Sequence, residues 1–214
     1  PRPVEIEIPP ETLAEEADIA LLDPAPALRP AASAEQIHAG AEVLRHARQP
    51  LIIAGGGVIA SKASAALQTL AEFLHAPVLT TAEGKGALSD RHPLALGAMR
   101  LRQDPIVEYL AQTDVVLAVG TRLAFPQLFR DQTVVQIDVD AAEIGRNYST
   151  ELGAVADARS ALGALVEAAR GLTHKSRGSL RDDIARGRTA FRSSFDHQWK
   201  SNQFPMRPER ILSD

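Results

Sequence analysis

The sequence predicts an α/β fold: a doubly wound, mostly parallel sheet with helices on both faces. Short apolar runs alternate with segments of helical periodicity along the chain. The runs are apolar at consecutive positions, which is typical of strands buried on both faces of a parallel sheet. Hydrophobic residues make up 45% of the 214 residues and aromatic residues only 4%, so the predicted core is aliphatic.

Residues 1–33 are predicted to connect this domain to one that lies upstream. Val4–Ile8 alternates apolar and acidic residues, as a strand with one buried face does, and two prolines then end it. A lone strand needs a partner sheet, and no neighbouring segment supplies one. The chain also begins at Pro1 rather than Met. We therefore expect Val4–Ile8 to close an upstream domain of a longer polypeptide.

Residues 34–171 are predicted to form the doubly wound domain. Ser33 and Gln36 resemble a capping box, which begins a helix that continues to about Ala47. Asp104 and Pro105 are typical of a further helix start. The other expected elements are strands at 51–54, 78–81, 115–119, 134–137 and 154–155, helices at 60–74 and 158–169, and mostly loop at 82–102.

Residues 172–214 are predicted to be a helical segment and a linker to a further domain. Apolar residues recur there at spacings of four and seven, on one helical face. This face either packs on its own domain or docks on a neighbouring one. Acidic residues interrupt the basic face, which disfavours nucleic-acid or membrane binding. The apolar face consists of Leu180, Ile184, Phe191, Phe195 and Trp199.

A glycine turn lies between the first predicted strand and the following helix. Residues 55–60 satisfy the pattern G-x-G-x-x-[G/A], in which glycine lets a phosphate approach the amides at a helix start. A dinucleotide-binding domain usually has an acidic residue at the end of its second strand. Here that strand ends in Thr80 and Thr81. Both a nucleotide-binding loop of the Rossmann-like NAD/FAD type and a merely tight turn remain open.

Two further strand ends carry residues suited to nucleotide binding. Arg122 could hold a phosphate by paired hydrogen bonds, or it could be a solvated surface residue. Asp138 could accept hydrogen bonds from ribose or adenine, while Asp140 could simply cap a short helix. The six histidines lack metal-ligand spacing, and no serine lies in a nucleophile elbow. The sequence thus predicts binding residues without a catalytic constellation.

Taken in order, several motifs resemble the central domain of thiamine-diphosphate enzymes of the acetolactate synthase, benzoylformate decarboxylase and oxalyl-CoA decarboxylase type. The resemblance covers roughly residues 34–170. Its motifs are Gln49 to Val58, Ala76 to Thr81, Gly84 to Gly86, Asp90 to Pro93, Gly97, Asp114 to Arg122, Gln136 to Asp140, and Ala156 to Ala158.

The resemblance implies that this chain is a non-catalytic part of a larger enzyme. Residues 3–9 look like the closing strand of the family's pyrimidine-binding domain, and residues 206–212 like the start of its diphosphate-binding domain. The family's Gly-Asp-Gly motif occurs nowhere in the chain. Thiamine diphosphate and Mg²⁺ would therefore serve the full-length 2-oxo-acid decarboxylase or carboligase without binding here. That parent enzyme is expected to be a homo-oligomer.

Some relatives hold ADP or FAD in this central domain. The segment after Thr121 resembles the ADP-holding branch more than the acetolactate synthases, which carry an Arg-Phe-Asp type of segment there. By resemblance, the candidate contacts are Gly55, Gly57, Arg122, Asp138, Val139, Asp157 and Ala158.

Composition narrows the alternatives. The chain has no cysteine, which excludes disulfides, thiolate zinc sites and a cysteine nucleophile, and fits a reducing, cytoplasmic location. No signal peptide or membrane span is evident, and a net charge of −4 disfavours nucleic-acid binding. A stand-alone NAD(P)-binding oxidoreductase is the main alternative. An NAD-dependent deacylase ranks last, because that group's zinc cysteines are missing.

Overall fold

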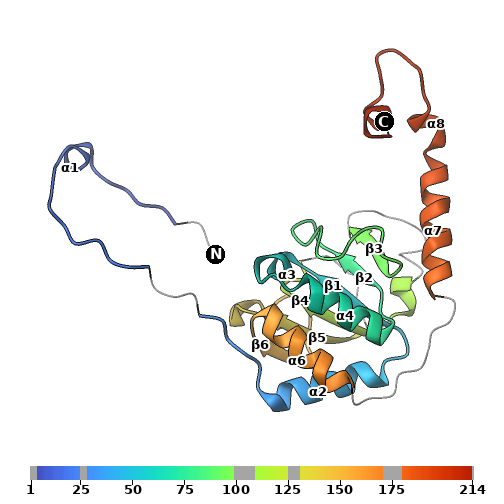
Figure 1. Cartoon of the computed structure of the whole chain (residues 1–214), viewed down its shortest axis with the longest axis horizontal. Coiled ribbons are helices and arrows are strands. Elements are labelled where there is room, and N and C mark those ends of the chain that lie inside the picture. Colours follow the sequence, from blue (N-terminus) through green and yellow to red (C-terminus); the bar gives the residue numbers. More distant parts are fainter. Residues whose placement is uncertain (1–3, 25–27, 99–108, 125–130, 171–179, 214) are drawn as a thin grey trace.

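The computed structural model describes residues 4–24, 28–98, 109–124, 131–170 and 180–213. Its centre is a sheet of six parallel strands in the order β3-β2-β1-β4-β5-β6 (Figure 1). This order places the topological switch point between β1 and β4. The strands are β1 Pro50–Ala54, β2 Val78–Thr80, β3 Ala95–Ala98, β4 Val115–Val119, β5 Thr133–Asp138 and β6 Leu152–Val155.

The predicted fold class is confirmed. All five residues of β1 and all five of β4 are buried, as central strands of a sheet covered on both faces must be. The β1–β2 and β3–β4 connections cross the sheet in opposite directions. Right-handed crossovers therefore place α4 (Ser64–Leu74) and a helical turn at residues 109–112 on opposite faces. The Tyr109 hydroxyl donates to the Pro50 carbonyl at 2.9 Å, which ties this turn to β1.

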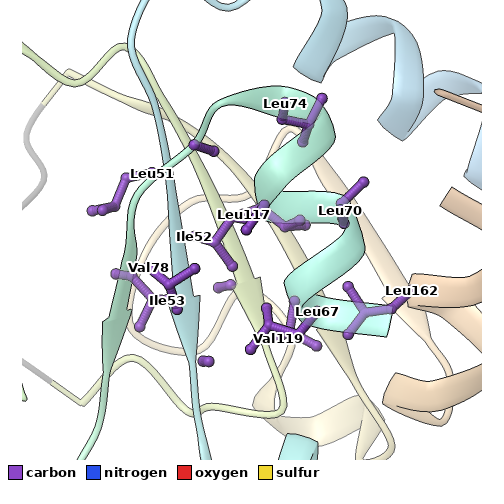
Figure 2. Close-up of a cluster of buried hydrophobic side chains, with 14 of the residues drawn as sticks. Leu51, Ile52, Ile53, Leu67, Leu70, Leu74, Val78, Leu117, Val119 and Leu162 are labelled. Carbon is purple, nitrogen blue, oxygen red and sulfur yellow. The ribbon is translucent and has the colours of Figure 1, made fainter. Parts of the chain in front are cut away.

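One face of the sheet is covered by α2 (Ala34–His46), α4 and α6 (Ala158–Arg170), and α6 packs against the other two (Figure 1). Figure 2 shows the aliphatic core between these helices and the central strands. Leu67, Leu70 and Leu74 of α4 are at most 2% exposed. Their spacing of three and four residues places them on one face of the helix, and their burial contributes to the hydrophobic stabilisation.

Local signals placed several boundaries correctly. The Ser33 hydroxyl accepts from the Gln36 amide at 3.1 Å, and the Gln36 side chain accepts from the Ser33 amide at 3.0 Å. This reciprocal pair is the predicted capping box of α2. The helix predicted at 60–74 is instead two helices, α3 (Gly56–Ala60) and α4. Lys62, with φ of +56°, breaks the helical path between them.

Val4–Ile8 is not a strand in this structure: Val4 is 83% exposed, and no strand among the described residues pairs with this segment. Its pairing within an upstream domain stays a prediction. Residues 82–94 are loop as predicted, but the strand β3 that follows them was not predicted. This strand is only four residues long and contains Gly97 at a φ of +88°, so its strand pattern is weak. The helix start at Asp104 and Pro105 lies outside the described residues.

The C-terminal helix α7 (Leu180–Ser194) packs on the domain, alongside β3 (Figure 1). Leu180 and Ile184 are buried, and Arg188 donates to the carbonyls of His92, at 2.7 Å, and Ala95. In the distal part of the predicted apolar face, the Phe191 and Phe195 rings meet edge to face, and the Phe195 and Trp199 rings stack. The remaining elements are α1 Pro10–Leu13, η1 Ala141–Glu143, α8 Asp196–Trp199 and α9 Pro208–Ser213.

Candidate functional site: the carboxyl edge of β4, β5 and β6

The predicted site residues lie at the ends of adjacent strands. Arg122 follows β4, Asp138 ends β5 with Val139 directly after it, and Asp157 follows β6. Because these strands are neighbours and parallel, the residues lie along one edge of the sheet, beginning at the switch point beside β1. Ligands of open α/β sheets bind outside the carboxyl ends of the strands at such a point.

The glycine turn after β1 packs directly against the turn after β4. A Cβ added to Gly55 would lie 2.1 Å from the Gly120 carbonyl oxygen, and one added to Gly57 would lie 2.6 Å from the Gly120 Cα. The Gly57 amide donates to the Gly120 carbonyl at 3.0 Å, and the Gly55 amide donates to the Val119 carbonyl at 2.9 Å. Glycine is therefore required here for close backbone packing. Both predicted glycines lie at the switch point, with their amides already bonded within the chain.

The turn that carries Arg122 has an unusual backbone. Gly120 and Leu123 have φ of +57° and +49°, and the Leu123 side chain is only 1% exposed. The Arg122 side chain between them faces solvent. Its carbonyl accepts from the Asn147 side chain at 2.7 Å. The main chain of Arg122 is therefore fixed by a hydrogen bond, while its guanidinium stays accessible to a ligand.

The end of β5 combines a buried carboxyl with an exposed apolar residue. Asp138 is 9% exposed, and its Oδ1 accepts from the Asp140 amide at 3.0 Å. Burial raises the pKa of Asp138, and the negative charge of Glu143 adds to this effect. Val139 is 56% exposed. A carboxyl group that burial disfavours in its charged form, at a strand end, is typical of binding sites.

Asp157 is engaged within the chain. Its Oδ1 accepts from the Arg159 and Ser160 amides at 3.0 and 3.3 Å, which caps α6. Its Oδ2 accepts from Arg29 at 3.2 Å, and its amide donates to the Pro30 carbonyl at 2.7 Å. Asp157 thus ties residues 29–30 to the sheet edge.

Ala158 begins α6 and is 6% exposed. Unlike Asp157, Ala158 has no polar side chain, and because it is buried, little of it is accessible to a ligand.

Sequence reasoning missed the buried polar residues beneath this edge. Gln136 is 2% exposed, and its side chain bonds to three separate backbone groups. Glu143 is 8% exposed and accepts from Arg146 through one carboxylate oxygen. Its other oxygen has no hydrogen-bond partner among the described residues. A polar residue at position 136 within an otherwise apolar strand was the available signal.

The edge combines an accessible guanidinium after β4 with a buried carboxyl and an exposed valine at the end of β5. Among the described residues, no three His, Cys, Asp or Glu side chains are grouped so that they could hold a metal ion. None of the described helices combines the length and apolar character needed to cross a bilayer. The fold is that of a doubly wound α/β domain with a parallel sheet.

Comparison with known proteins gives the family. The thiamine pyrophosphate enzyme central-domain model matches residues 37–165, which is more than half of the chain. The chain is 34% identical to glyoxylate carboligase of Escherichia coli O157:H7, over all of this chain and 38% of that protein. It is 33% identical to a probable acetolactate synthase large subunit of Methanocaldococcus jannaschii, over 84% of this chain and 31% of that protein. The chain belongs to the family of thiamine pyrophosphate enzyme central domains.

A solved structure supports the fold. An enzyme isolated from Mycobacterium smegmatis and assigned to the thiamin diphosphate-dependent class superposes with a TM-score of 0.58 and 24% identity. The match covers 68% of this chain and 29% of the other. The chain thus spans about a third of the length of the relatives it matches.

Proposed function

We propose that this chain is the non-catalytic central domain of a thiamine-diphosphate-dependent carboligase or decarboxylase that acts on 2-oxo acids. Its relatives include a glyoxylate carboligase that is more than twice as long as the matched region. The reacting machinery, with thiamine diphosphate and Mg²⁺, then belongs to the parts of the polypeptide that flank this domain. The full-length protein is a cytoplasmic homo-oligomer in this proposal.

We further propose that the carboxyl edge of β4–β6 binds an adenine nucleotide, and ADP in preference to FAD. The observation that carries this is the placement of Arg122, Asp138 and Val139 at neighbouring strand ends beside the switch point. The guanidinium of Arg122 would pair with phosphate oxygens. The carboxyl of Asp138 would accept from ribose or adenine donors, and Val139 would lie against the base. Gly55, Gly57, Asp157 and Ala158 would line the same edge.

Calorimetric titration of the chain with ADP, FAD and NAD⁺ tests the nucleotide proposal. We expect saturable binding of ADP, which Arg122→Ala weakens by about tenfold or more through loss of a charge-assisted bidentate contact. Arg170→Ala is the matched control, because Arg170 is an exposed arginine at the far end of α6. Equal ADP affinity in both variants would refute the role of Arg122. Preferential NAD⁺ binding would favour an oxidoreductase instead.

Turnover measurements test the non-catalytic assignment. The chain is incubated with glyoxylate or pyruvate, thiamine diphosphate and Mg²⁺, and carbon dioxide release is followed. We expect no release above the protein-free blank. Release that depends on the chain would overturn the assignment, whatever the nucleotide result.

A further inference from the structure

Two side-chain amides donate hydrogen bonds to the arginine turn, which comprises residues 120–123. The Gln136 Nε2 donates to the Thr121 carbonyl at 3.2 Å, and the Asn147 Nδ2 donates to the Arg122 carbonyl at 2.7 Å. Gln136 comes from β5 and Asn147 from the segment after η1. Two consecutive carbonyls of one turn are therefore bonded to side chains from elsewhere in the chain. We call Gln136 and Asn147 the amide clamp.

The turn needs such support because its backbone is strained. Leu123 has a φ of +49°, a left-handed conformation that a leucine rarely adopts and that costs about 1 kcal/mol or more. Such a conformation persists only where its surroundings fix it. The buried Leu123 side chain and the bond from its amide to the Thr121 hydroxyl, at 3.2 Å, fix one end. The amide clamp fixes the two residues before it.

Gln136 also connects the turn to the segment that follows β5. Its Nε2 donates a second bond to the Glu143 carbonyl at 3.0 Å, and its Oε1 accepts from the Gly145 amide at 2.9 Å. Both N–H groups of the buried Gln136 Nε2 thus donate hydrogen bonds. A leucine or methionine of similar size would remove the bonds to the Thr121 carbonyl and the Gly145 amide, and would leave the Glu143 carbonyl with only the Arg146 amide at 3.4 Å. The amide at position 136 therefore sets the spacing between the turn and residues 143–147.

We propose that the amide clamp positions Arg122 for ligand binding, so that Gln136 and Asn147 are positioning residues that need not touch the ligand themselves. The proposal rests on the nucleotide-binding function given above. The main chain of Arg122 is held on both sides, while its side chain stays exposed. A guanidinium presented from a fixed main chain loses less conformational freedom when a phosphate binds.

The test uses Asn147→Ala in the full chain, because Asn147 is exposed and the variant is expected to fold. We expect ADP binding to weaken about tenfold, while the melting temperature changes little. Asn202→Ala, another exposed asparagine, is the matched control and should bind ADP as the wild type does. If the Asn147 and Asn202 variants bind ADP equally well, the positioning role is wrong.

Gln136→Met tests the clamp without any ligand. Hydrogen exchange of the Gly145 amide, measured residue by residue, should be at least tenfold faster in this variant, because its acceptor is gone. Gln68→Met replaces an exposed glutamine of α4 and should leave that amide unchanged. Unchanged exchange at Gly145 in the Gln136 variant would overturn the clamp. If the wild type binds no ADP, the nucleotide proposal fails, yet the exchange result still decides on the clamp.

Discussion

Replacing Gly55 by alanine should destabilise the domain severely. The backbone of Gly55, with φ of −100°, is open to any residue, so the effect is purely steric. The new Cβ would lie 2.1 Å from the Gly120 carbonyl oxygen, and about 0.9 Å of movement is needed to reach the 3.0 Å that real contacts respect. Overpacking of this kind costs about 1–3 kcal/mol. Separating the two turns also lengthens two backbone hydrogen bonds, each contributing about 1 kcal/mol.

The expected loss is therefore about 3–5 kcal/mol, against a total stability of about 5–15 kcal/mol for a domain. Urea unfolding followed by circular dichroism measures this loss as a fall in the midpoint. Gly163→Ala is the matched control, because a Cβ at Gly163 in α6 would meet nothing within 4 Å. That variant should gain about 0.5–1 kcal/mol from helix propensity. A Gly55 variant as stable as the wild type would refute the steric reasoning.

Three further predictions concern charged groups. Arg188→Ala should lower the free energy of unfolding in urea by about 1.5–3 kcal/mol, because it removes the charged donor that bonds to two carbonyls beside β3. Arg186→Ala is the control: it breaks only an exposed ion pair and should lower that free energy by about 0.5 kcal/mol or less. Burial acts to raise the pKa of Asp114, but hydrogen bonds from backbone amides outweigh this effect and lower the pKa. Asp114→Ala should therefore be less stable than the wild type at neutral pH. The urea midpoints of the two proteins should converge as the pH falls through the folded pKa of Asp114. Burial raises the pKa of Asp138, so its ionised form destabilises the folded state as the pH rises through the folded pKa. At pH 7, Asp138→Asn should therefore have a urea midpoint equal to or above that of the wild type, while it binds ADP more weakly in the titration. A urea midpoint clearly below that of the wild type would contradict this.

Patterns that are local in sequence predicted most of the fold. Apolar runs of four or five residues became the central strands, because a strand buried on both faces needs such a run wherever it lies in the sheet. The capping box at Ser33 and Gln36 was predictable because both of its bonds form within four residues. The parallel order of the sheet followed from the alternation of strands and helices.

Features that depend on distant partners were not predictable. The edge strand β3 exists through pairing with β2 on one side and Arg188 on the other, a residue more than ninety positions away. Val4–Ile8 has the strand pattern, but no strand among the described residues pairs with it, and it is exposed. The role of Gln136 was not predictable, because its three partners come together only once the sheet has formed.

The Gly55 and Gly57 amides of the glycine turn are bonded within the chain. In a dinucleotide-binding loop the amides after the first strand are directed at a phosphate. Here the Gly55 and Gly57 amides donate to the carbonyls of Val119 and Gly120, so phosphate binding through them would require the two turns to separate. An anion at this edge would more readily meet the exposed guanidinium of Arg122. Substitution of the glycines should therefore report on folding, and substitution of Arg122 on ligand affinity.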